Sequence, residues 1–152
     1  MSTQYDIGEL VTQHRLLKAQ QLTTEVGDRI NPDVLPQGEP LPALRYETNH
    51  TDNQHDLSGQ SGEAFTRLQI DSYGRTRREA NHVAAIVEDL LDGWGGEAIG
   101  PDDQVWVFEC TLDNQWDQRD QPAPGSDEYR YIRKQDFVIG HTKPTPSLTP
   151  LT

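Results

Sequence analysis

The chain has 152 residues, a formal net charge of -12, a hydrophobic content of 33% and a mean hydropathy of -0.80. This length allows one domain with a small hydrophobic core. The negative charge argues against a protein that grips nucleic acid, because phosphate binding relies on Lys and Arg side chains. The single cysteine, Cys110, excludes an internal disulfide, and no apolar run approaches the length of a membrane span.

The N-terminal segment is predicted to be one amphipathic helix followed by an extended connector. Asp6 and Glu9 have the three-residue spacing of a helix N-cap and its partner, and apolar residues then recur at helical spacing to about residue 22. Residues 27–42 contain four prolines, which disfavour both a helix and a central strand. We expect this connector to cross the protein surface.

The next two segments are predicted to form a β-hairpin. Residues 43–51 place Leu44 and Tyr46 on one side and Arg45 and Glu47 on the other, and residues 63–72 alternate in the same way. Residues 52–62 between them are polar apart from Leu57 and contain two glycines, so they are expected to form a flexible tip.

A long amphipathic helix follows the hairpin almost without a loop. Thr76 and Glu79 have the spacing of a capping box, which predicts the start of the helix. The apolar residues of its predicted buried face are Ala80, Val83, Ala84, Val87 and Leu91. Gly93 and the glycines after it predict its end.

The rest of the chain is predicted to contain two strands. Residues 104–112 are apolar on both faces, residues 113–126 are polar and expected to be a loop, and residues 127–140 alternate again. The predicted fold class is therefore α+β, with about four mainly antiparallel strands and two helices packed on the sheet. We expect one domain over residues 1–140 and a flexible Pro/Thr-rich arm over residues 141–152, too polar to bury anything.

No catalytic, cofactor-binding or metal-binding residues are predicted, so an enzyme is not expected. The five histidines belong to four different elements, which argues against a metal site. Asp113, Asp117 and Asp120 lack the alternate spacing and the central glycine of a calcium loop. They are interpreted as part of a solvated segment.

Charges on the long helix are placed against the helix dipole. Arg75, Arg77 and Arg78 stand at its start, where acidic residues would be favoured, and acidic residues stand at its end. We hypothesise that these arginines contact an acidic surface of a neighbouring subunit, such as residues 97–128, which carry nine acidic residues and one basic residue. The alternatives are an exposed, unpaired helix end and a solvated acidic loop region.

Three stretches of the chain together resemble a known family. They are GDRINPDVLPQG at residues 27–38, LPALRY at residues 41–46, and LQIDSY at residues 68–73, with the last followed by Arg75, Thr76 and an Ala/Val-rich helix. In this order and spacing the chain resembles the tail completion, or tail terminator, proteins of tailed bacteriophages, which also occur in prophages and gene transfer agents. The resemblance covers residues 26–91 and does not extend to the acidic segment or the C-terminal arm.

The resemblance implies a structural virion protein with no reaction and no cofactor. Similar proteins form hexameric rings that cap the head-proximal end of the tail tube, end its polymerisation and meet the head completion, or stopper, protein of the neck. DNA would pass through the ring without specific binding, and assembly would take place in the host bacterial cytoplasm without a membrane. The residues expected to face the lumen or an axial partner are Asp52, His55, Asp56, Asp113, Asp117 and Asp120.

Two other interpretations stay open at this point. The chain could be another neck component, such as a head completion protein, or a tail tube protein, which would polymerise into long tubes on its own. From a different class, it could be a small acidic binding module or a DNA mimic. Such a module would stay monomeric or dimeric and would bind a basic partner with strong salt dependence.

Overall fold

The computed structural model describes residues 6–56, 59–121 and 129–143. The described strands form a six-stranded sheet in the order β1-β2-β3-β6-β5-β4, in which β1 pairs parallel with β2 and the other neighbours are antiparallel. The strands are β1 Ile30–Pro32, β2 Ala43–Asp56, β3 Gly59–Gly74, β4 Glu97–Ile99, β5 Val105–Asp120 and β6 Arg130–Thr142. The helical elements are α1 Ile7–Val11, the π-helical turn η1 Thr12–Leu16, α2 Gln20–Val26, α3 Arg77–Leu91 and the 3-10 turn η2 Pro101–Asp103.

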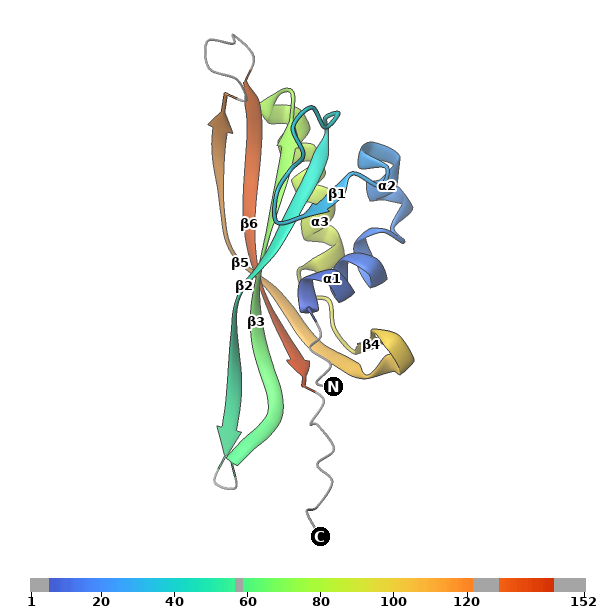
Figure 1. Cartoon of the computed structure of the whole chain (residues 1–152), viewed down its shortest axis with the longest axis vertical. Helices are drawn as coiled ribbons and strands as arrows, with labels where there is room; N and C mark the ends of the chain where they lie inside the picture. Colours follow the sequence, from blue (N-terminus) through green and yellow to red (C-terminus); the bar gives the residue numbers. More distant parts are fainter. Residues whose placement is uncertain (1–5, 57–58, 122–128, 144–152) are drawn as a thin grey trace.

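The helices cover one face of a long, twisted sheet (Figure 1). The β2–β3 hairpin reaches beyond them at one end of the molecule, and the β5–β6 hairpin extends toward the other end. The core lies between α3 and the middle of the sheet, where Leu68, Ile70 and Phe137 are fully buried together with Val83 and Val87 of α3. Burial of these apolar side chains fixes which face of each strand points inward.

The predicted start and buried face of the long helix are confirmed. The hydroxyl of Thr76 accepts a hydrogen bond from the backbone N–H of Glu79 at 3.1 Å, and the Glu79 carboxylate accepts one from the N–H of Arg75 at 2.9 Å. At the other end, the Asp92 carboxylate accepts a hydrogen bond from the N–H of Leu112 at 2.9 Å. The helix is therefore capped by neighbouring residues at its start and tied to β5 at its end.

The single predicted N-terminal helix is wrong, because the segment divides into α1, η1 and α2. Its start is confirmed, since the Asp6 carboxylate accepts a hydrogen bond from the N–H of Gly8 at 2.9 Å. Leu16 and Leu22 are both fully buried. In one straight helix, residues six apart would point about 120° from each other, so the change of direction lets both side chains reach the core.

The predicted hairpin is confirmed, but its strands are longer than expected. β2 continues to Asp56 and β3 begins at Gly59, so the expected tip over residues 52–62 is mostly strand. The expected loop over residues 113–126 is wrong in the same way, because β5 continues to Asp120. Polar cross-strand pairs support the extension of β5, among them Asp117 with Arg133 at 3.0 Å and Asp120 with Arg130 at 2.8 Å. Residues 57–58 and 122–128 lie outside the described chain.

The α+β class is confirmed, but the expected number of elements was too small. The short strands β1 and β4 were not predicted, and the described chain contains three α-helices rather than two. β6 also continues past residue 140, where the predicted domain ends. His141, placed in the polar arm by the sequence, is buried and lies 2.7 Å from the Thr66 hydroxyl. Residues 144–152 of that arm lie outside the described residues.

Part of the connector covers the sheet face opposite the helices. Leu35 and Leu41 from this connector pack with Ala43, Tyr73 and Ile132 in a second, smaller apolar cluster. The connector was expected to cross the surface, and this cluster shows what holds it there. No described helix is both long and apolar enough to cross a membrane.

Candidate assembly surfaces

The arginines at the start of α3 are not equivalent. Arg75 forms an ion pair with Glu79, with its guanidinium nitrogens at 3.1 and 2.7 Å from the two carboxylate oxygens. This pair lowers the pKa of the Glu79 carboxyl and places a negative charge on the first turn, where the helix dipole favours it. The expectation that all three arginines lack compensation within the helix is therefore wrong for Arg75.

Arg77 and Arg78 are exposed and have no partner among the described residues. At the other end of α3, Glu88 and Asp89 also have no ion-pair partner within the described part of the chain. The helix dipole opposes the charge at both ends, at a cost of a few tenths of a kcal/mol per group on an exposed surface. Arg77 and Arg78 are thus two cations that can form ion pairs with another molecule. Their contact with a neighbouring subunit stays a prediction.

The acidic residues predicted on residues 113–120 are brought together on β5, each beside an arginine. Asp113 pairs with Arg67 of β3 at 2.6 Å. In the same way, Asp117 pairs with Arg133 at 3.0 Å, and Asp120 pairs with Arg130 at 2.8 Å. Each of these three aspartates is therefore neutralised by an arginine of the same copy.

The other predicted acidic residues lie at the opposite end, on the β2–β3 hairpin. The Asp52 carboxylate is exposed and lies 2.7 Å from Nε2 of His50. The backbones of His55 and Asp56 belong to β2, but their side chains lie outside the described residues. The structure thus separates the six predicted residues into two groups, and whether either group faces a lumen or an axial partner stays a prediction.

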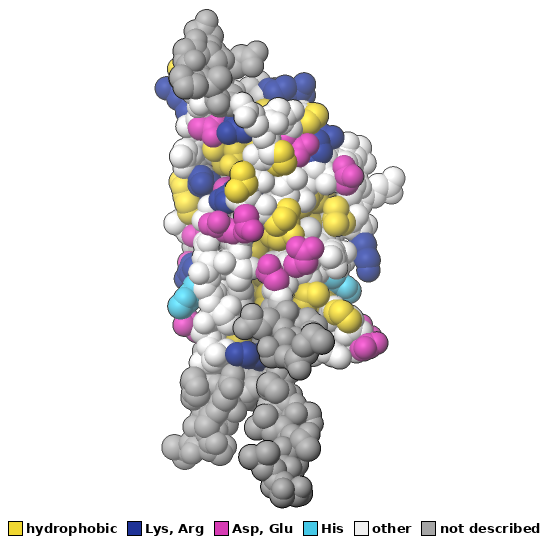
Figure 2. Space-filling model, in the orientation of Figure 1, with side chains coloured by type: hydrophobic (Ala, Val, Ile, Leu, Met, Phe, Trp, Pro, Cys, Tyr) yellow, Lys and Arg dark blue, Asp and Glu magenta, His cyan; other side chains and the backbone are white. Residues whose placement is uncertain are grey.

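The molecule carries a basic group of side chains at one end. Figure 2 shows several Lys and Arg side chains at the upper end, where Figure 1 places the start of α3 and the β5–β6 hairpin. The arginines in these elements include Arg77, Arg78, Arg119 and Arg130, and Arg119 lies over the ring of Tyr129 at 5.1 Å. A net charge of -12 therefore coexists with a locally basic end.

One charged group on the sheet face opposite the helices is buried. Asp71 has an exposed side-chain fraction of 0%, and its carboxylate is paired with Arg45 at 2.8 Å and with Lys134 at 3.4 Å. The amide nitrogen of Gln69 donates to the other carboxylate oxygen at 3.0 Å. Arg45 also pairs with Glu47 at 3.1 Å. This network joins β2, β3 and β6, so it stabilises the sheet rather than presenting free charge.

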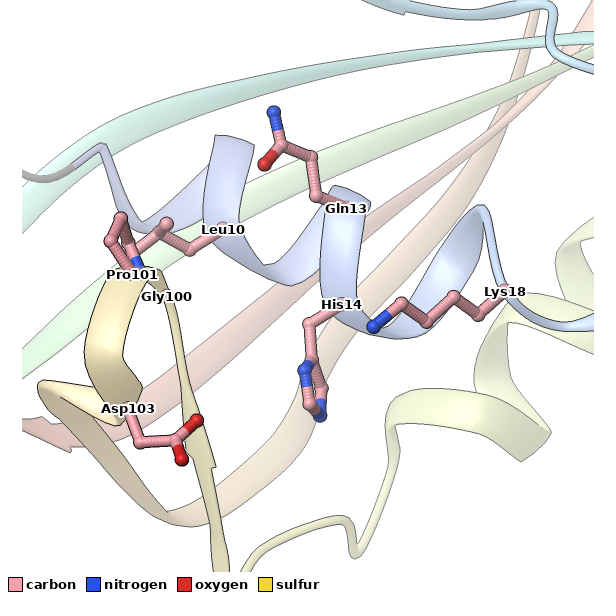
Figure 3. Close-up of a pocket in the computed structure, with 7 residues that line it drawn as sticks. All are labelled: Leu10, Gln13, His14, Lys18, Gly100, Pro101 and Asp103. Carbon is pink, nitrogen blue, oxygen red and sulfur yellow. The ribbon is translucent and has the colours of Figure 1, made fainter.

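A cleft of about 410 Å³ opens between η1 and η2 (Figure 3). Gln13, His14 and Lys18 line one wall, and Pro101 and Asp103 line the other. The imidazole of His14 is already engaged at 2.8 Å by the Glu97 carboxylate, and this hydrogen bond is the main cause of the lowered Glu97 pKa. The cleft has both charge signs and no group poised as a nucleophile, and no cluster of three metal-ligating side chains exists among the described residues.

Comparison with protein families gives a match over most of the chain. The model of the family described as "Tail completion protein gp17" matches residues 12–122, which is more than half of the chain. The chain belongs to this tail completion family. The protein is therefore a structural protein of a phage-type tail. The resemblance in the GDRINPDVLPQG and LQIDSY stretches implied the same family.

A solved structure has the same fold as this tail completion protein. The matching chain comes from a structure titled "Virion of native gene transfer agent (GTA) particle", with a TM-score of 0.61 and 19% sequence identity. The alignment covers 89% of this chain and 94% of that chain. A search of curated protein sequences gave no match.

Sequence reasoning missed the groups that neutralise the acidic segment. Arg130 and Arg133 are close to the acidic residues in sequence, but only the β5–β6 register brings each one opposite its partner. The signal that could have suggested an antiparallel pair was the opposite charge of the two stretches, with Asp117 and Asp120 followed by Arg130 and Arg133 at the same three-residue spacing.

Proposed function

We propose that this tail completion protein forms a ring at the head-proximal end of the tail tube, ends the growth of the tube and joins the tail to the neck. The observation that carries the proposal is the family match over residues 12–122. The likeness of fold to a chain of a gene transfer agent virion supports it. The ring would be a hexamer with the tail tube protein on one side and the head completion protein on the other.

The free arginines of α3 support a head-to-tail ring contact. Arg77 and Arg78 are exposed and have no partner among the described residues, so a neighbouring copy in a ring can bring the acidic surface of residues 97–128 to them. In this arrangement DNA passes through the lumen without specific binding. The acidic groups on β2 and β5 would face the lumen or an axial partner, and a ring structure with both groups pointing radially outward would contradict that placement.

The test is an assembly assay with the tail tube protein of the same particle. Adding this chain at a few copies per tube should stop elongation, and electron microscopy with a label on the chain should place it only at the head-proximal end. Labelling along the whole tube would instead identify a tube protein, and labelling of tail-free heads would identify a head completion protein. Either result would overturn the proposal.

A charge-reversed variant tests the arginine contact separately. Arg77→Glu combined with Arg78→Glu should abolish capping and ring formation. The matched control is Lys18→Glu, which reverses an exposed cation in the cleft between η1 and η2, away from α3. Rings of unchanged size from the double arginine variant would refute the arginine contact and leave the capping function standing.

A further inference from the structure

Each edge of the sheet is half covered and half open among the described residues. On one edge, β1 pairs only with the first residues of β2, from Leu44 to Tyr46. On the other edge, β4 pairs only with the first residues of β5, from Val105 to Val107. Beyond Tyr46 in β2 and Leu112 in β5, no described strand pairs with the outer side of either strand.

The register places the two open halves at opposite ends of the sheet. One row across the sheet runs from Tyr46 through Ile70 and Gln135 to Gln115, so the covered half of β2 is level with the open half of β5. The row that begins at Thr51 ends at Cys110, where the outer side of β5 is still engaged by the chain that follows α3. The β2 edge is thus open at the lower end and the β5 edge at the upper end (Figure 1).

The backbone groups of these halves point outward at known positions. The N–H of Leu112 bonds to the Asp92 side chain and the N–H of Gln115 to the Asn114 side chain, so neither points at β6. Because donors alternate along an antiparallel ladder, the N–H of Arg119 also points outward. In β2, the N–H of Leu44 points outward, because it donates to the carbonyl of Arg29. Outward N–H groups recur at every second residue, and the β-bulge after Thr48 shifts this pattern by one residue. The N–H groups of Thr51 and Asn53 therefore point outward.

The open halves lack Pro and Lys, two residues that commonly block strand addition. Pro and Lys on an edge prevent another chain from pairing there. Pro32 occupies the outer strand β1, whereas residues 47–53 and 114–120 contain neither Pro nor Lys. The strand that covers the first residues of β2 thus ends in a proline, Pro32, whereas the open halves contain no such blocking residue.

We propose that the open half of β5 in one copy of this chain pairs with the open half of β2 in the next copy. The inference rests on the proposed ring and names the surface that closes it. β5 and β2 run in opposite directions within one sheet, so neighbouring copies in a ring meet as antiparallel strands. The strands must be tilted to the ring axis, because only a tilt brings the upper half of β5 in one copy level with the lower half of β2 in the next. The stagger between the two halves is the kind of offset that closing a sheet into a barrel requires.

Charge on the two halves is compatible with this contact. Residues 47–53 carry Glu47 and Asp52 and no basic side chain except His50. Residues 114–120 carry Arg119, while their two aspartates are held by arginines of the same copy. The two edges are different surfaces, so the contact is heterologous, and repeating it leads to a closed ring rather than to a pair.

Proline substitutions on the open halves test the proposal. Arg119→Pro removes one outward N–H without removing a bond between β5 and β6, and Arg119→Ala is its matched control because it loses the same side chain and keeps the N–H. Asn53→Pro and Asn53→Ala form the same pair on β2. Both proline variants should keep the circular dichroism spectrum of the parent and lose ring formation in light scattering and negative-stain images, while both alanine variants should form rings.

Amide hydrogen exchange gives a second measurement that needs no variant. In assembled rings the outward amides of Thr51, Asn53 and Arg119 should exchange at least about 100-fold more slowly than in the isolated chain, because a backbone ladder would protect them. Rings with unchanged exchange at these amides, or rings formed equally well by the proline variants, would overturn the edge contact and leave the ring itself standing. A chain that caps tubes without forming any ring would overturn both.

Discussion

Replacing Asp71 by Asn should be among the most damaging single changes in this protein. The Asp71 side chain is 0% exposed, and its carboxylate faces Arg45 at 2.8 Å and Lys134 at 3.4 Å. Asn has nearly the same shape, so the change removes a negative charge without creating a cavity. It leaves Lys134, which is 16% exposed, facing an amide instead of a carboxylate, and it leaves Arg45, which is 14% exposed, with only Glu47 at 3.1 Å.

The expected loss of stability follows from this burial. Removing one partner of a buried ion pair costs about 3–5 kcal/mol, and we expect the lower end, about 3 kcal/mol, because both cations keep some contact with water. For a chain of this size, each kcal/mol shifts the melting temperature by about 2–4 °C, so Asp71→Asn should melt about 6–12 °C below the parent. Urea denaturation followed by circular dichroism would measure the free energy directly.

A control separates burial from charge. Glu47→Gln removes the other carboxylate that pairs with Arg45, at 3.1 Å, but this side chain is 35% exposed. An exposed pair contributes less than about 1 kcal/mol, so the control should melt close to the parent. Equal losses from Asp71→Asn and Glu47→Gln, or a loss below about 1 kcal/mol from Asp71→Asn, would refute the reasoning.

Three further changes have expected outcomes. Burial lowers the pKa of His141 below its ordinary value of 6.5, so the folded state favours the neutral imidazole. The free energy of unfolding should therefore fall as the pH drops below about 6.5. In urea titrations at several pH values, His141→Gln should make this dependence on pH weaker. Gly95→Ala would place a methyl group 2.5 Å from the backbone oxygen of Phe108, so it should cost about 1–3 kcal/mol in urea denaturation. Arg77→Glu combined with Arg78→Glu should leave the melting temperature unchanged or slightly raised, because acidic residues at a helix start favour the dipole; a clear loss of stability would show that these arginines have partners within one copy.

The elements predicted correctly are those whose sequence carries its own signal. Thr76 and Glu79 mark the start of α3 through a local hydrogen bond, and the buried positions of α3 recur at helical spacing. Leu44 and Tyr46 alternate with charged residues because β2 has one buried face at its start. Each of these signals needs only residues that are neighbours in sequence.

The elements that were missed depend on residues far apart in sequence. Asp113 lies at a bulge of β5, where it pairs with Arg67 of β3 across β6, at a separation of 46 residues. Likewise β1 exists only because β2 offers an edge to it, and a segment with Pro32 carries no strand signal of its own. Polar strands held by cross-strand pairs do not alternate between apolar and polar residues, so periodicity could not identify them.

The candidate assembly surface could be predicted only in part. Arg77 and Arg78 were selected because their charge opposes the helix dipole, and the described chain indeed leaves both without a partner. Arg75 was selected by the same reasoning, but Glu79 was already its partner. The open edges of β2 and β5 had no sequence signal, because an edge is defined by the absence of a neighbouring strand and depends on the whole sheet order.

The buried core limits how copies of this chain can meet. A hydrophobic content of 33% is compatible with a core that a partner's surface completes. The core between α3 and the sheet is instead closed within one copy, and the exposed large apolar side chains of the described residues, Leu17, Val34, Trp106 and Tyr129, are spread over different segments. Permanent interfaces are rich in buried apolar area, whereas contacts between edge strands and free arginines are polar. Such contacts favour a subunit that folds stably alone before it joins a ring.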